Sequence, residues 1–361
     1  MTAATHSFRS DNNAGLCPEA LAALAAAASG HAVGYGDDPW TAAGVAAIQG
    51  IFGDPAAAVF FVATGTAANT LAVAALTEPW QRVLCHSHAH WNDDESTAPE
   101  RMTMCRTTPI SPRGEPTRLA VADVEGALVG LRGDVHQPTP GALTLSNPTE
   151  FGTVYRPEAM KALAAVAHAR GFSVHVDGAR FANAVVCVAE ERGCSAEAAA
   201  RALTVEAGID ALSLGGTKNG LACGEAVVFF GAAGARAAAR FPFLRKSSGH
   251  LLSKHRFVSA PFAATLTSGA WSVHARQANA MARLLAAGLG ARGLAPAFPC
   301  EANGVFLKKL PAALEAGLRA RGHGFYPFAS PVGETARLMC SFDTTEAAVA
   351  GFLRDVDALL G

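Results

Sequence analysis

The most informative stretch of the chain is His175-Val-Asp-Gly-Ala-Arg180. It closes an apolar run, and 41 residues after its Asp177 comes Lys218, in the string Ser-Leu-Gly-Gly-Thr-Lys-Asn-Gly. An acid at the end of one buried strand and a lysine after the next suit pyridoxal phosphate (PLP). The amine holds the aldehyde as a Schiff base, and the carboxylate keeps the ring nitrogen protonated. Taken singly, each residue has an ordinary alternative role, as a helix cap or a surface lysine. Together, at the carboxyl ends of parallel strands, they predict a PLP site.

Strand-like apolar runs alternate with helical patterns along most of the chain. Such alternation is typical of βαβ units and a mostly parallel sheet, so the expected fold class is α/β. The expected strands are 58–63, 82–86, 142–146, 172–177, 211–214 and 225–230. The expected helices between them are 66–77, 157–170 and 195–208.

Near residue 257 the pattern changes to a long helical stretch that runs to 290. Strand 305–310, helix 311–321, strand 337–342 and a last helix from 344 are expected after it. We therefore expect three parts: an N-terminal segment at the subunit interface, a large PLP-binding α/β domain, and a small α+β domain with its connecting helix. Their expected bounds are 1–40, 41–256 and 257–361.

Composition and charge narrow the class of protein. The chain has 361 residues, half of them hydrophobic, and a net charge of −1, which gives no support to nucleic acid or a membrane surface as partner. Its apolar runs are far shorter than a membrane span, and its first ten residues lack the apolar core of a signal peptide. Eight cysteines are scattered without a C-x-x-C pair, as expected of free thiols in a reducing cytoplasm.

The turn Thr64-Gly65-Thr66 follows an expected strand and opens an expected helix. Glycine lets the backbone approach an anion, and the free N–H groups of the first helical turn favour phosphate. This signal is weak alone, because such turns are common. The chain lacks both the P-loop pattern and the G-x-G-x-x-G of a dinucleotide site, which argues against a nucleotide-dependent oxidoreductase.

Several strings resemble the L-threonine aldolase family, in the same order and over essentially the whole chain. They are Ser10-Asp-Asn12, Gly34-Tyr-Gly-Asp-Asp-Pro39, the turn from Thr64 to Asn69, Ala89-His90, His175 to Arg180, and Lys218. The resemblance implies fold type I of the PLP enzymes, with a large mostly parallel sheet domain and a small C-terminal domain. It also implies a homotetramer built from dimers with shared active sites.

The resemblance assigns roles to individual residues. The implied catalytic residues are Lys218, His90, Asp177 and Glu95. The implied cofactor-binding residues are Gly65, Thr66, His90, Asp177, Arg180, Thr217, Lys218 and Lys254. The implied substrate-binding residues are Ser10, Tyr35, Arg180 and Arg337, the arginines being suited to a carboxylate. Tyr35 and Lys254 would face the site of a neighbouring subunit. Arg180 has open alternatives, pairing with Asp177 or with the cofactor's phenolate oxygen.

His86-Ser-His-Ala-His90 also suggests a metal site, since an extended backbone would place three imidazoles on one face. A strand end that feeds a loop rarely holds all three in register, so we expect no metal. His90 is the residue we single out, because a neutral imidazole is flat enough to stack on a pyridine ring and titrates where a general base is useful.

The expected reaction is PLP-dependent cleavage of an L-β-hydroxy-α-amino acid, such as threonine, allo-threonine or phenylserine, to glycine and an aldehyde. Many threonine aldolases carry a histidine in the segment matching 147–152, and this chain has none, so a mechanism with two histidines is in doubt. Trp91 is a further candidate for a difference in specificity. The alternatives are transamination or β-elimination on a related amino acid, and a PLP-binding protein without turnover.

Overall fold

A seven-stranded sheet lies at the centre of the structure, a computed structural model that describes residues 7–361. The strands run in the order β1-β7-β6-β5-β4-β2-β3 and are parallel except β7, which is antiparallel to both of its neighbours. Their bounds are β1 Ala58–Val62, β2 Gln81–His86, β3 Arg106–Ile110, β4 Thr139–Ser146, β5 Ser173–Gly178, β6 Ala211–Gly215 and β7 Glu225–Phe229. The α/β class expected from the sequence is confirmed.

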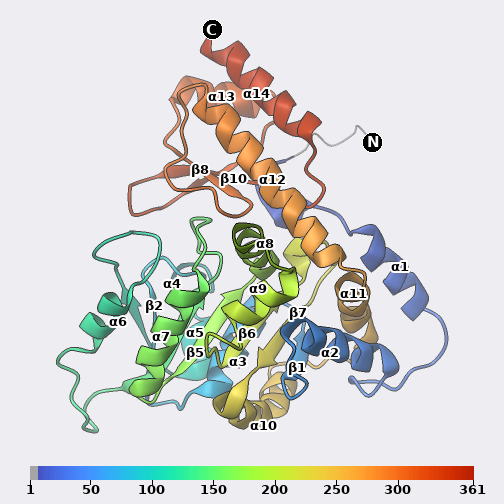
Figure 1. Cartoon of the computed structure of the whole chain (residues 1–361), viewed down its shortest axis with the longest axis vertical. Coiled ribbons are helices and arrows are strands. Elements are labelled where there is room, and N and C mark those ends of the chain that lie inside the picture. The colour runs from blue at the N-terminus through green and yellow to red at the C-terminus, as the bar shows by residue number, and fades with distance from the viewer. Residues whose placement is uncertain (1–6) are drawn as a thin grey trace.

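Helices cover both faces of this sheet (Figure 1). Successive residues of β7 point to opposite faces: Val228 belongs to the core under α2, α7, α8 and α9, and Val227 to the core under α3 and α10. β7 is therefore buried on both sides, which explains why it reads as an almost continuous apolar run. The helices are α2 Pro39–Phe52, α3 Gly65–Leu76, α4 His90–Asp93, α5 Ala98–Thr103, α6 Val121–Leu128, α7 Pro157–Ala169, α8 Phe181–Arg192, α9 Ala196–Leu203 and α10 Gly231–Ser247.

A smaller antiparallel sheet follows, with strand order β8-β10-β9. Its strands are β8 Gly304–Lys308, β9 Tyr326–Phe328 and β10 Thr335–Met339, and its helices are α13 Ala312–Ala320 and α14 Glu346–Leu360. Figure 1 shows α12 (Ala270–Gly290) running from α11 (Arg256–Thr267), beside the large sheet, up to this smaller unit. The expected long helical stretch is thus two helices, separated at Ser268-Gly269, where Gly269 has φ 76°.

The N-terminal segment contacts both units. Phe8 packs edge-on against Phe352 of α14, with ring centroids 5.3 Å apart, and its carbonyl accepts a hydrogen bond from Met339 N. The next elements, η1 (Asp11–Asn13) and α1 (Pro18–Ala27), lie against η2 (Thr217–Asn219) and α11. The division of the chain at residues 40 and 256 stays a prediction.

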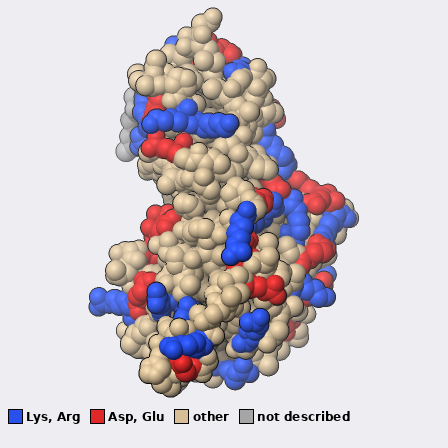
Figure 2. Space-filling view, turned by 90° about the vertical axis from the view of Figure 1, so that its left-hand side faces the viewer, with Lys and Arg blue, Asp and Glu red and all other residues tan. Residues whose placement is uncertain are grey.

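None of the helices within residues 7–361 is both long and apolar enough to cross a bilayer. Positive and negative side chains are interspersed over the face in Figure 2, in keeping with the net charge of −1.

Candidate active site

A cavity of about 260 Å³ opens at the carboxyl ends of β5 and β6. Asp177 reaches it from β5, and Lys218 from the short turn η2 that follows β6. Six of the residues singled out from the sequence line it: Gly65, Thr66, His90, Asp177, Thr217 and Lys218. The structure therefore brings together an amine, a carboxylate, an imidazole and the start of a helix around one space.

Asp177 is buried and held as a carboxylate. Its Oδ1 accepts a hydrogen bond from Ala179 N at 3.0 Å, and its Oδ2 accepts one from Asn69 Nδ2 at 2.9 Å. Burial alone would raise the pKa of Asp177, but His90, the Ala179 N–H and Lys218 outweigh it and lower that pKa below its usual value. A buried, fixed anion is what a protonated pyridine nitrogen requires as a partner.

His90 and Glu95 form a coupled pair beside Asp177. The Nδ1 of His90 lies 2.9 Å from Oε1 of Glu95, whose side chain is buried. Burial lowers the pKa of His90, but the hydrogen bond to Glu95 and the charges of Asp177 and Glu150 raise it to about 9. Since Glu95 accepts from Nδ1, Nε2 is the ring nitrogen left for a ligand in the cavity.

Asn69 joins these groups, and sequence reasoning had given it no role. Its Nδ2 donates to Glu95 Oε1 at 2.7 Å as well as to Asp177 Oδ2. Asn69 lies on the second turn of α3, one helical turn after Gly65 and Thr66, so the helix that begins at the cavity also orients both acids. The sequence pattern that could have identified Asn69 is the string from Thr64 to Asn69, of which it is the last residue.

The start of α3 offers an anion site. Thr64 caps the helix through its side chain, which accepts from Ala67 N at 3.2 Å. The N–H groups of Gly65 and Thr66 precede the first hydrogen bonds within the helix and carry its positive dipole end. A Cβ built on Gly65 would meet no heavy atom within 4 Å, so the space above it is open.

Two arginines are candidates for binding an anionic group of the substrate, Arg180 at the start of α8 and Arg337 on β10. Arg180 makes a two-pronged ion pair with buried Asp11, at 2.6 and 2.9 Å, and lowers the pKa of Asp11 to about 2 against the effect of burial. The alternative pairing of Arg180 with Asp177 is not formed. Arg337 stacks over Phe328 at 5.0 Å, and its buried Nε has no hydrogen-bond partner among the described residues. Such an unpaired guanidinium suits a bound carboxylate.

Glu225 is a second residue of the site that sequence reasoning missed. It lies on β7 in the cavity lining, and its Oε2 accepts from Gly216 N at 2.6 Å. Burial raises the pKa of Glu225 to about 7. A lone charged residue opening an otherwise apolar strand was the sequence signal.

The remaining predicted residues lie apart from the cavity lining. Ser10 caps η1 by accepting from Asn12 N at 3.2 Å, next to Asp11. Tyr35, which is 53% exposed, and Lys254 lie on the surface, so their role at a neighbouring subunit stays a prediction.

The three histidines of the possible metal site do not converge. His86 ends β2 and its Nδ1 accepts from His88 N at 2.9 Å, while His88 pairs with Asp93 at 3.3 Å. His90 instead lies beside Glu95 and Asp177, and the potential ligand atoms of these three residues all lie within 4.8 Å of one another.

The residues around the cavity fit PLP. They supply an amine for the aldehyde, a buried carboxylate for the ring nitrogen, a helix start with open space for the phosphate, and an imidazole with a free ring nitrogen. No nucleotide-binding pattern competes for this helix start.

Threonine aldolases are among the known proteins that resemble this chain both in sequence and in fold. The sequence profile of the β-eliminating lyases matches residues 7–309. Low-specificity L-threonine aldolases of Pseudomonas sp. (strain NCIMB 10558) and Pseudomonas aeruginosa are each 42% identical, covering 100% of this chain and 99% and 100% of their own lengths. The threonine aldolase structure of Leishmania major superposes with a TM-score of 0.87 at 26% identity, over 99% of this chain and all of that one. A Sphingomonas wittichii serine palmitoyltransferase shares the fold, with a TM-score of 0.68 at 17% identity, over 98% of this chain and 87% of that one.

Proposed function

The chain belongs to the β-eliminating lyase family. We propose that it is a PLP-dependent carbon–carbon lyase, which cleaves L-β-hydroxy-α-amino acids to glycine and an aldehyde. Threonine, allo-threonine and phenylserine are the substrate types. The observation that carries this proposal is the arrangement of Lys218, Asp177 and the His90–Glu95 pair around one cavity, with Asn69 bridging the acids.

Five residues would hold the cofactor. Lys218 would bind its aldehyde, Asp177 its ring nitrogen, and the N–H groups of Gly65 and Thr66 its phosphate, with Thr217 beside them. When bound, PLP would act as an electron sink for the carbanion left on the glycine carbon. His90 lies where an imidazole could stack on the ring, and its charge is balanced by Asp177 and Glu95.

The arginines would orient the substrate. Arg337 has a buried Nε without a hydrogen-bond partner within residues 7–361, which makes it the main candidate for the substrate α-carboxylate. Arg180, fixed by Asp11, would add a second positive charge, and Ser10 would contribute from the adjoining turn. Holding the carboxylate fixes the rotation about the nitrogen–Cα bond, which decides whether the bond to Cβ, to hydrogen or to the carboxyl carbon lies in position to break.

The His90–Glu95 pair would manage the proton of the β-hydroxyl group. That proton must leave oxygen as the Cα–Cβ bond breaks and the aldehyde forms. In the enzyme form in which His90 has lost the proton of its imidazolium, Nε2 would take the hydroxyl proton, directly or through a water held with Glu95, while Glu95 keeps the ring oriented through Nδ1. One histidine aided by two acids therefore suffices here, in a chain without a histidine in segment 147–152.

A β-elimination is the second candidate function, favoured by the description of the family profile. The same cavity would serve it, because only the bond that is aligned differs. Its products are ammonia and a keto acid, which distinguishes it from an aldolase. Transamination would instead leave the cofactor as its amine, and PLP binding without turnover would leave the substrate intact.

The proposal includes an assembly and a compartment. We place Tyr35 and Lys254 at the site of a neighbouring copy, in a homotetramer made of dimers, because both are exposed and neither lines its own cavity. All eight cysteines are free, which supports a reducing cytoplasm.

The test is product analysis with purified enzyme and PLP, using L-threonine, L-allo-threonine and L-threo-phenylserine. Release of glycine and the matching aldehyde in equal amounts is expected, with none from Lys218→Ala. Ammonia and a keto acid, or turnover that survives in Lys218→Ala, would reject the proposal.

A further inference from the structure

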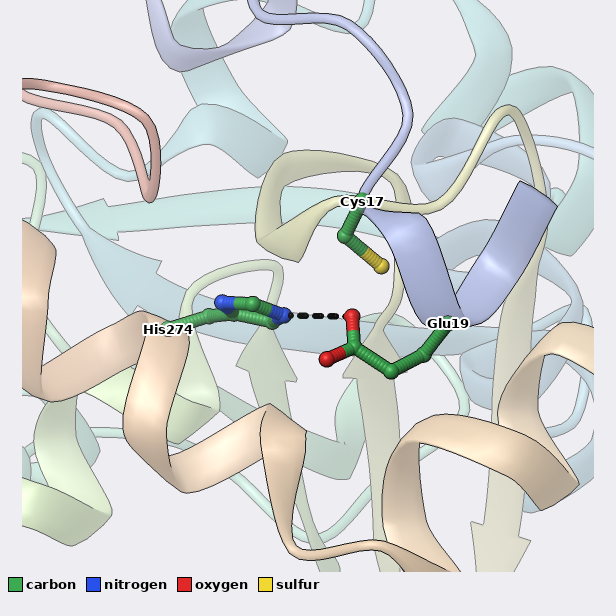
Figure 3. A group of neighbouring side chains, drawn as sticks. All are labelled: Cys17, Glu19 and His274. Carbon is green, nitrogen blue, oxygen red and sulfur yellow. Dashed lines mark hydrogen bonds and ion pairs between the residues drawn. The ribbon is translucent and has the colours of Figure 1, made fainter. Parts of the chain in front are cut away.

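Three potential metal ligands converge on the side of the molecule where α1 meets α12. They are the Sγ of Cys17, the carboxylate of Glu19 and the imidazole of His274, whose ligand atoms all lie within 4.8 Å of one another. Figure 3 shows the three side chains pointing toward one space, with Glu19 and His274 already joined. That contact is 3.1 Å, between Oε2 and Nε2.

The local fold fixes each of these side chains. Cys17 is the residue before Pro18 at the start of α1, so its backbone is extended and its side chain turns back under the first turn, where Glu19 lies. His274 is in the first turns of α12, where its ring packs against Phe342 with centroids 5.1 Å apart. The three ligands therefore come from two elements that are separate in the sequence.

The cluster lies against the loop that carries Lys218. Cys17 N donates to Gly220 O at 2.8 Å, and a Cβ on Gly220 would come within 2.9 Å of the Cys17 Cβ. On the other side, Asn219 Nδ2 donates to Trp271 O at 2.9 Å, one helical turn before His274. The loop 217–220 is thus held between the same two elements that supply the ligands.

The three ligand groups indicate which class of metal ion the site would bind. One thiolate, one imidazole and one carboxylate form the mixed sulfur, nitrogen and oxygen shell that Zn²⁺ and similar borderline-soft ions prefer, whereas Mg²⁺ and Ca²⁺ require oxygen. Three protein ligands leave a fourth tetrahedral position for water. Cys17 is fully buried, but the side chain of Glu19 is 34% exposed, which leaves an approach from solvent.

We propose that Cys17, Glu19 and His274 form a binding site for a zinc-class divalent cation, and that the bound ion ties α1 to α12 beside the loop that carries Lys218. Binding replaces the Glu19–His274 contact by two bonds to the metal. The thiol proton of Cys17 passes to solvent as the sulfur–metal bond forms, the proton on Nε2 of His274 moves to Nδ1 or to solvent as the nitrogen–metal bond forms, and nothing is oxidised or reduced. The site is separate from the cavity of the proposed reaction, whose lining includes none of its ligands.

The test is zinc binding to the PLP-loaded enzyme after treatment with a chelator. We expect stoichiometric uptake of Zn²⁺, an X-ray absorption spectrum with a single sulfur neighbour at about 2.3 Å and lighter ligands at about 2.0–2.2 Å, and a raised melting temperature. Cys17→Ser should lose the sulfur neighbour and the rise in melting temperature. Glu19→Gln, which removes a ligand on the exposed side, should weaken binding by at least about tenfold.

Cys223→Ser is the matched control, because Cys223 is an exposed thiol beside Lys218 and could itself capture zinc. This variant should keep the sulfur neighbour. A zinc shell without sulfur in the wild type, or a sulfur neighbour that persists in Cys17→Ser and disappears in Cys223→Ser, would overturn the site. None of these results depends on aldehyde release, so the metal site and the proposed reaction can fail independently.

Discussion

At the scale of single residues, Asn69 is the side chain on which the site's organisation depends. One amide nitrogen donates to both Glu95 and Asp177. In Asn69→Ala the Oδ2 atom of buried Asp177 is left without a donor among the described residues, at a cost of about 1–3 kcal/mol, and Glu95 Oε1 keeps only its hydrogen bond with His90. We expect kcat for aldehyde release to fall on the order of a hundredfold, as for a misplaced catalytic group, with the PLP band retained. Asn92→Ala, which removes an exposed amide near His90, should have little effect, and equal losses in both variants would contradict this role.

The raised pKa of His90 gives a prediction for stability without the cofactor. The folded protein binds this proton up to about pH 9, whereas an unfolded histidine releases it near 6.5. The stabilisation is therefore complete below pH 6.5 and is lost as the pH rises through 9. Urea unfolding of the cofactor-free protein at these two pH values should show a smaller decline in free energy for His90→Gln than for wild type. Equal declines in the free energy of unfolding of the two proteins would contradict a raised pKa of His90.

The sequence predicted the residues of the cavity better than it predicted their partners. Gly65, His90, Asp177 and Lys218 stood in recognisable strings, each set by a local strand end or helix start. The partnership of Arg180 with Asp11 spans 169 positions, and that of Asn69 with Asp177 spans 108. Pairs of this kind are created only when distant elements pack, so no local pattern reveals them.

At the scale of elements, continuous apolar strands were predicted well, whereas β3 and β9, short strands with a proline inside, were missed. The eight expected strands all occur, six in the large sheet and two in the small one, within a few residues of their expected ends. β3 was missed because Arg106-Thr-Thr-Pro-Ile110 is polar and contains proline, which is tolerated at the edge position that β3 holds. The helix expected over 195–208 ends at Leu203, because Thr204 leaves the helical region with φ −128° and ψ −86°. Alanine-rich sequence alone could not place that stop.

The start of α3 gives a prediction about the cofactor. A methyl group on Gly65 meets no protein atom but enters the space proposed for the phosphate. Gly65→Ala should therefore leave the melting temperature of the cofactor-free protein unchanged or slightly higher, while the Kd for PLP rises on the order of tenfold, or about 1.4 kcal/mol. Gly50→Ala is the control, because Gly50 lies in α2 with equal space around it. An unchanged Kd in Gly65→Ala would remove this turn from the phosphate site.

At the scale of the whole molecule, the residues proposed for the site come from two units, each with a hydrophobic core of its own. The large core lies on the seven-stranded sheet, and the smaller one includes Phe8 from the N-terminal segment together with α12 and α14. Arg337 comes from the small unit and Asp177 from the large one. The position of one unit against the other would therefore set the distance between the arginine proposed for the substrate carboxylate and the acid proposed for the cofactor ring. The chain order of the two units was predictable from the change in pattern near residue 257, but the participation of Phe8 was not.

The proposed sharing of sites between copies is tested by mixing two inactive variants. Lys218→Ala lacks the amine, and Tyr35→Ala lacks the exposed ring that would reach the neighbouring site. In a mixed dimer one site has both groups intact, so co-refolded or co-expressed chains should recover part of the aldolase activity. A Trp80→Ala variant, which loses another exposed aromatic ring, should be active by itself. No recovery on mixing, with mixed dimers present, would place Tyr35 outside the neighbour's site.

Lys218 is the residue proposed to bind the cofactor aldehyde, and chemical reduction of that bond would identify the lysine. Borohydride reduction turns a lysine-bound aldehyde into a stable amine, so digestion and mass spectrometry of the reduced, PLP-loaded enzyme identify the lysine. We expect the reduced PLP group on the peptide that contains Gly216-Thr-Lys-Asn219, and we expect this label to disappear in Lys218→Ala. A label on Lys254 or another lysine in the wild type, or none at all, would contradict it.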